Sequence, residues 1–186
     1  MALESLTIWQ QTFKDEVPPV SDASWPDSIT DWYADRFDDP RLSLPGLTIN
    51  VPPLPVVFGK AAFKGKIVEL NPGLSQSAAM TIVADAWELG LNASTVSVIP
   101  LDAIGVPSPT TQWSSVTSSV FDPTSVAAGK SKILELIGAP NVDDALDAQF
   151  PVKFREATLL LTVTTTGLDS VAPTPNPLTD PTRAVA

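Results

Sequence analysis

Residues 129–131 of this chain read GKS, the ending of a loop that cradles phosphate groups. Such a loop needs a first glycine at position 124 so that its backbone N–H groups can wrap around a phosphate, but Thr124 stands there. The loop also needs a preceding strand, whereas Asp122 followed by Pro123 is typical of a helix start. The pattern therefore favours an exposed helical turn over a nucleotide-binding site.

Asp143, Asp144 and Asp147 carry the carboxylates that Ca²⁺ prefers as ligands. Their spacing does not match the acidic calcium-binding loop, which has a glycine at its centre. Asn141, just before them, is a favourable helix cap, and the helix dipole favours acids in a first turn. We interpret the group as the start of a short helix and assign no metal ligand.

Paired carboxylates can also hydrolyse glycosidic bonds, and Asp31, Asp38 and Asp39 are the candidates for such a pair. This chemistry needs one carboxyl group buried beside a cleft, and an N-terminal arm is a poor place for one. Asp39 followed by Pro40 is more simply the exit of a helix. A carboxylate-dependent hydrolase is therefore the weakest functional hypothesis for this chain.

Trp113 lies in a stretch from residue 100 to residue 123 that is rich in Pro, Ser and Thr. An exposed ring at this position would stack on a sugar or a peptide, whereas a buried ring would anchor its own loop to the core. A monomeric sugar- or peptide-binding module that uses Trp113 and this loop is therefore an alternative function.

The composition narrows the remaining possibilities. The chain has 11 basic and 21 acidic residues and a net charge of −10, which disfavours binding to nucleic acid phosphates. It contains no Cys and no His, so it lacks thiolate ligands and the commonest acid–base residue of enzymes. We therefore expect a protein that is not an enzyme and that needs no cofactor and no catalytic residue.

The chain divides into three parts by composition. Residues 1–41 form an acidic arm that is rich in aromatic residues, residues 42–168 form the folded body, and residues 169–186 form an extended tail rich in Pro and Thr. The tail has little to bury, so we expect it to be disordered in isolation. The start of the chain lacks a basic region followed by an apolar run, which predicts no signal peptide, and no apolar run is long enough for a transmembrane segment.

Periodicity predicts the elements of the body. Strands are expected at 61–70, 94–100, 114–121 and 154–167, and helices at 75–89, 122–138 and 141–151. Gly90 would end the first helix, Pro151 would end the third, and the last strand would be central. The predicted fold is α+β, a mainly antiparallel sheet with two to three helices plus extended N- and C-terminal arms.

The N-terminal arm reads as two short amphipathic helices joined by Pro18-Pro19. Helices this short are marginal in water, so both must dock, either on their own body or on a neighbouring subunit. The second possibility would make the arm a set of aromatic anchors in a neighbour's groove. The residues assigned to subunit contacts are Trp9, Phe13, Trp25, Ile29, Trp32, Tyr33, Phe37, Pro173, Pro175 and Pro177.

These features together favour a structural subunit of a large symmetric assembly over a binding module. The leading hypothesis is a virus or bacteriophage virion protein, used in capsid decoration, in head–tail connection or in the tail. Its partners would be copies of itself and other structural proteins, with no nucleic acid and no membrane. The expected location is the virion, with the cytoplasm as the alternative.

Overall fold

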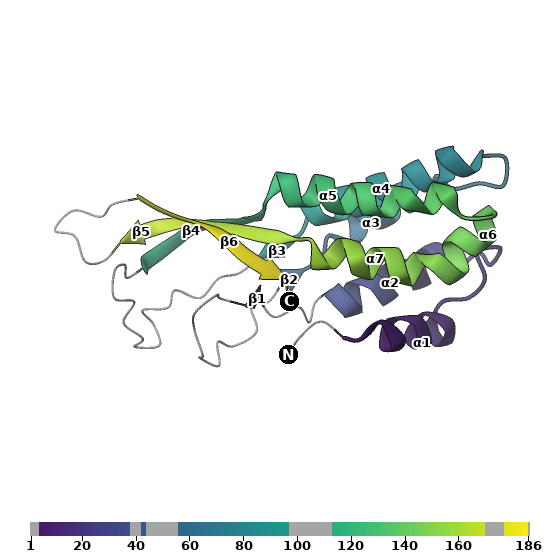
Figure 1. The fold of residues 1–186 in the computed structure, drawn as a ribbon, viewed down its shortest axis with the longest axis horizontal. Coiled ribbons are helices and arrows are strands. Elements are labelled where there is room, and N and C mark those ends of the chain that lie inside the picture. Colours follow the sequence, from purple (N-terminus) through teal and green to yellow (C-terminus); the bar gives the residue numbers. More distant parts are fainter. Residues whose placement is uncertain (1–3, 38–41, 44–55, 97–112, 170–176, 186) are drawn as a thin grey trace.

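The computed structural model describes residues 4–37, 42–43, 56–96, 113–169 and 177–185. Figure 1 shows an elongated molecule in which a helical body occupies one end and a twisted sheet projects from the other end. The helices are α1 (Leu6–Glu16), α2 (Trp25–Phe37), α3 (Lys60–Ile67), α4 (Gln76–Asn92), α5 (Pro123–Leu134), α6 (Val142–Asp144) and α7 (Phe150–Leu159). A 3₁₀ turn follows α5 at Glu135–Gly138, and a π-helical turn at Ala145–Gln149 joins α6 to α7.

The strands form two antiparallel sheets. They are β1 (Leu42–Ser43), β2 (Val56–Val57), β3 (Thr95–Val96), β4 (Trp113–Phe121), β5 (Thr162–Asp169) and β6 (Pro177–Val185). The larger sheet has the order β1-β6-β5-β4, and β2 pairs with β3 in the smaller one. Residues 177–185, which were expected to be a disordered tail, therefore form a strand beside β5.

The predicted mainly antiparallel sheet with two to three helices is wrong, because helices dominate the described part of the chain and supply most of its buried core. The segment 61–70 shows why. Phe63 and Ile67 alternate with polar residues as in a strand, but they are also four residues apart and share one face of a helix. Both are fully buried in α3, so the helical interpretation of the same spacing holds.

The segment 154–167 divides between two elements. Phe150, Phe154, Ala157 and Thr158 are buried at helical spacing on α7, and the strand β5 begins only at Thr162. Pro151, which was predicted to end a helix, instead lies in the first turn of α7, where its missing N–H costs nothing. The central strand is therefore shorter than predicted, and a helix replaces its first part.

Gly90 does not end its helix either. It lies inside α4, which continues to Asn92, and the ring of Phe58 packs directly on it. The glycine is needed for this close approach and not for a left-handed backbone. The predicted start of α4 is confirmed, since the Ser75 side chain accepts a hydrogen bond of 3.2 Å from the N–H of Ala78.

Two other predicted helix starts are confirmed by the same kind of cap. The Asp122 carboxylate accepts hydrogen bonds from the N–H groups of Thr124 and Ser125, at 2.8 and 3.1 Å, with Pro123 in the first turn of α5. The Asn141 side chain accepts a hydrogen bond of 2.8 Å from the N–H of Asp144 at the start of α6. These local signals depend on few residues, which is why the sequence reveals them.

The acidic face of α2 pairs with α3. The Lys60 ammonium lies 3.0 Å from the Asp31 carboxylate and 3.8 Å from that of Asp35, and Lys64 pairs with Asp27. Each of these exposed pairs adds little stability. Their common spacing of four residues on both helices, however, orients α3 along α2 and turns its apolar face towards the core.

We expect Gly129→Ala to lower the free energy of unfolding by about 1–3 kcal/mol, because a methyl group there would overlap the Trp87 ring and lie 3.1 Å from the carbonyl oxygen of Ala157. The matched control is Gly65→Ala in α3, where nothing lies within 4 Å of the added methyl group. That substitution should raise the stability by roughly 0.5–1 kcal/mol. Urea unfolding followed by circular dichroism measures both, and equal effects would contradict the packing described here.

Candidate functional site

The aromatic residues of the N-terminal segment lie in the core of their own chain. Trp9, Phe13, Trp25, Ile29, Trp32, Tyr33 and Phe37 are all buried, each with 4% or less of its surface exposed. In this fold, α1 and α2 are part of the helical body and not a free arm. A subunit contact through these seven side chains would require both helices to leave the body.

Tyr33 of α2 connects this core to helices α4 and α7. Its ring makes edge contacts with Phe58 and Phe154, each at a centroid distance of 5.0 Å. Its hydroxyl oxygen accepts a hydrogen bond of 2.7 Å from Nε1 of Trp87 on α4. The hydroxyl also bonds to Oγ1 of Thr158 on α7 at 2.9 Å.

The direction of this hydrogen-bond chain follows from counting protons. The Thr158 hydroxyl donates its only proton to the carbonyl oxygen of Phe154, at 2.8 Å. Tyr33 must therefore donate to Thr158 while it accepts from Trp87. Burial raises the pKa of Tyr33 far above its ordinary value, so this hydroxyl group keeps the proton that it donates to Thr158.

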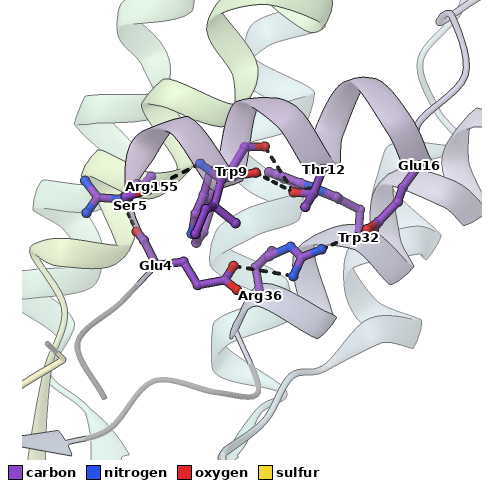
Figure 2. Close-up of polar contacts among 9 residues, drawn as sticks. Glu4, Ser5, Trp9, Thr12, Glu16, Trp32, Arg36 and Arg155 are labelled. Carbon is purple, nitrogen blue, oxygen red and sulfur yellow. Dashed lines mark hydrogen bonds and ion pairs between the residues drawn. The ribbon is translucent and has the colours of Figure 1, made fainter.

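Polar contacts hold α1 against α2 (Figure 2). The Arg36 guanidinium lies between two carboxylates, 3.4 Å from that of Glu4 and 2.8 Å from that of Glu16. Nε1 of Trp32 donates a hydrogen bond of 3.1 Å to Oγ1 of Thr12. Because Arg36 and Trp32 lie on α2 and their partners lie on or beside α1, these contacts fix the position of the N-terminal helix.

The other residues assigned to contacts lie at the sheet or outside the described residues. Pro173 and Pro175 fall outside them, and Pro177 is the first residue of β6. Trp113 is the first residue of β4, but its side chain lies outside the described part of the structure. Its proposed stacking on a ligand therefore stays a prediction.

The GKS segment is a helical turn on α5, as predicted, but the predicted exposure is wrong at Gly129. Gly129 is buried beneath the ring of Trp87. The Lys130 ammonium lies 2.7 Å from the Asp85 carboxylate and 2.6 Å from that of Glu88, and the hydrogen bonds that it donates to both carboxylates raise the pKa of Lys130. This lysine ties α5 to α4.

Of the three carboxylates considered for hydrolysis, one lies among the described residues. Asp31 pairs with Lys60, and Asp38 and Asp39 lie outside the described residues. Partial burial and the nearby Asp143 raise the pKa of Asp147. No group of three or more potential metal ligands gathers anywhere in the part of the chain that the structure describes.

A pocket of about 450 Å³ opens at the end of the helical body that is remote from the sheet. Four segments line it: the α1–α2 connection and the start of α2 at residues 20–26, the end of α3 and its following turn at residues 67–72, Ala79 of α4, and the start of α6 with the π-helical turn at residues 142–146. We call it the end pocket. Its lining is mostly apolar, and it has the size of a small-ligand or side-chain site. The sequence does not reveal it, because its walls come from four segments that are distant along the chain.

The contribution of the N-terminal helix α1 to the stability of the fold can be tested at two neighbouring positions. We expect Trp9→Ala to lower the free energy of unfolding by about 3–5 kcal/mol, because it leaves a cavity beside Trp32 and Tyr33. Ile8 is 44% exposed on the same helix, so Ile8→Ala should change the stability by less than about 0.5 kcal/mol. Similar small effects at both positions in chemical denaturation would mean that α1 is not part of the core.

The hydrogen-bond chain at Tyr33 predicts a second result. Tyr33→Phe should cost about 1–3 kcal/mol, because it leaves the buried N–H of Trp87 without an acceptor. In a double-mutant cycle with Thr158→Val, urea unfolding should show a coupling of roughly 0.5–3 kcal/mol. If the effects of the two substitutions on the free energy of unfolding were simply additive, the hydrogen-bond chain through Tyr33 and Thr158 would be excluded.

The raised pKa of Tyr33 adds a pH dependence to the same comparison. Between the unfolded pKa of about 10 and the higher folded pKa, the folded state binds more protons, so stability falls as pH rises. The wild-type chain should therefore lose more stability above pH ~10 than Tyr33→Phe does. Titration of the lysines is common to both chains and cancels in the difference.

Comparisons of this chain with protein-family models, with curated proteins and with solved structures found no match. Among the described residues, no helix is both long enough and apolar enough to cross a membrane. Within the described residues, the projecting sheet and the end pocket are the two features that suggest contact with another molecule.

Proposed function

We propose that this protein is a non-enzymatic structural subunit of a large symmetric assembly, of the kind that builds a virus or bacteriophage particle. The projecting sheet of β4, β5 and β6, and not the N-terminal helices, would form the main contact with neighbouring subunits. The observation that carries this proposal is a sheet that extends beyond the helical body and whose strands β4 and β5 are rich in Ser and Thr.

A sheet of this kind is unstable alone. Three strands become independently stable when they have an apolar face or pack against a helix. β4 and β5 consist largely of Ser and Thr, and in the described residues the main contacts of β4, β5 and β6 are with one another. The outer part of the sheet therefore gains stability if a neighbouring subunit covers it.

Both edges of the sheet carry features that hinder the addition of further strands. β4 is an edge strand with irregular register near Ser115 and Ser118, and bulges of this kind twist an edge away from new partners. β6 contains Pro177 and Pro181, which donate no ladder hydrogen bond, and β1 pairs only with its last residues. These features favour contacts through the faces of the sheet, which suit a closed assembly better than a fibre.

The first test is the solution mass of the full chain across a concentration series, measured by light scattering coupled to size exclusion. We expect oligomers or a growing assembly. Hydrogen exchange should show weak amide protection in β4–β6 in the dilute chain and strong protection after assembly, because the sheet would be completed by the neighbour.

A proline in the central strand tests the role of the sheet directly. Thr166 pairs with Ser118 on one side and with Thr179 on the other. Thr166→Pro removes a ladder donor and should abolish assembly while the helical circular dichroism signal remains. Thr166→Val, which keeps the N–H and the β-branched shape, is the matched control and should assemble normally.

Two results would overturn the proposal. One is a monomer at every concentration whose β4–β6 amides are already strongly protected, since the sheet would then need no partner. The other is unchanged assembly of the Thr166→Pro chain, since the contact would then lie elsewhere.

A further inference from the structure

The end pocket has a preformed floor. Trp25 and Ala79 line it and are almost fully buried, with exposed fractions of 2% and 4%, and Ile67 beside them is completely buried. The Trp25 ring contacts Phe150 of the core at a centroid distance of 6.4 Å. Because these residues belong to the main core, the floor of the pocket does not depend on a ligand for its shape.

The turns at the mouth of the pocket are held by hydrogen bonds. Oδ1 of Asp22 accepts bonds of 2.8 Å from both the N–H and the hydroxyl group of Ser24. Oδ1 of Asn71 accepts a bond of 3.1 Å from the N–H of Gly73. These bonds hold the opening at the α1–α2 connection and at the turn after α3, which lowers the entropy cost of filling the pocket.

Apolar surface remains uncovered around this opening. Val20, Leu70 and Val142 are only partly buried where they line the pocket, and Val68 is 55% exposed. Water-exposed apolar side chains that surround a concave site favour an apolar occupant. The size of the pocket suits one or two large side chains of a protein segment.

The charges at the opening have one sign. Asp22 and Asp143 line the pocket, and no Lys or Arg does. Hydrogen bonds from Ser24 lower the pKa of Asp22, so its carboxylate is negative at neutral pH. The nearby Lys66 already pairs with Glu69, at 2.5 Å.

A second pocket of about 330 Å³ borders the same α1–α2 connection. Its lining includes Lys14, Val17, Pro18 and Pro19 on one side and Asp147 and Ala148 of the π-helical turn on the other. Asp147 adds a carboxylate near Asp143, and partial burial, followed by the proximity of Asp143, raises the pKa of Asp147. Unlike the end pocket, this second pocket has a cation, Lys14, in its own lining.

We propose that the end pocket binds a segment of a partner protein that presents an apolar anchor flanked by Lys or Arg. The anchor would fill the space between Trp25, Ile67 and Val142, and the flanking cations would lie beside Asp22 and Asp143. This contact is separate from the sheet, and its test does not depend on assembly.

The test uses two short peptides of equal size, acetyl-Lys-Leu-Phe-Lys-amide and its charge-reversed form acetyl-Glu-Leu-Phe-Glu-amide. Each is titrated into the isotopically labelled full chain at low salt while amide chemical shifts are followed by NMR. The basic peptide should cause saturable shifts at Val68, Ala79 and Val142. It should bind roughly fivefold tighter than the acidic peptide, because it adds two exposed charge contacts.

Matched variants locate the site. Val142→Lys places a cation inside the pocket and should reduce the affinity for the basic peptide at least about tenfold, since it removes apolar contact and adds repulsion. Ile137 is 40% exposed and does not line the pocket, so Ile137→Lys should leave the affinity unchanged. Asp143→Asn should reduce the preference for the basic peptide without abolishing binding. The NMR spectrum of each variant shows whether it is folded.

Equal affinity for the two peptides, no binding of either, or an unchanged affinity in Val142→Lys would each overturn the proposal. Self-association that Val142→Lys abolishes would assign the pocket to a second copy and would also contradict it. The peptide titration uses the dilute chain and does not require assembly. Its results would therefore still test the pocket if the proposed sheet contact proved wrong.

Discussion

The buried hydroxyl group of Tyr33 is the interaction on which the helical body depends. It connects α2 to α4 through Trp87 and to α7 through Thr158, three helices that are far apart in the sequence. A buried polar group of this kind is costly when unpaired and specific when paired, so it selects one arrangement of the three helices. The surrounding rings, including Trp9 of α1 and Phe63 of α3, then pack on a fixed centre.

This arrangement makes the two ends of the molecule different. The helical body satisfies its aromatic residues internally, so the N-terminal aromatic cluster is explained by folding and needs no neighbour. The sheet at the other end has strands rich in Ser and Thr and extends beyond the helices. We therefore propose the Ser- and Thr-rich strands, and not the N-terminal aromatic residues, as the surface that contacts a partner.

The parts of the fold that the sequence predicts are those with local causes. Ser75, Asp122 and Asn141 cap their helices as expected, because a cap needs only its own first turn. Local alternation failed at Phe63 and Ile67, since a spacing of four residues fits a strand and a helix equally well. The predictions that Gly90 and Pro151 end helices were wrong, because tertiary packing determines the role of Gly90 and the position within the first helical turn determines that of Pro151. The end pocket was missed because no single segment contains it.

The two proposed surfaces differ in chemistry and lie at opposite ends of the long axis (Figure 1). A polar sheet complements another polar surface, whereas an apolar pocket with acidic residues at its opening complements an apolar anchor with basic neighbours. The end pocket is not complementary to itself, so a contact through it would join unlike patches. Such heterologous contacts close into rings or continue as chains, according to the rotation between subunits. An elongated subunit with unlike ends is therefore suited to link two different neighbours.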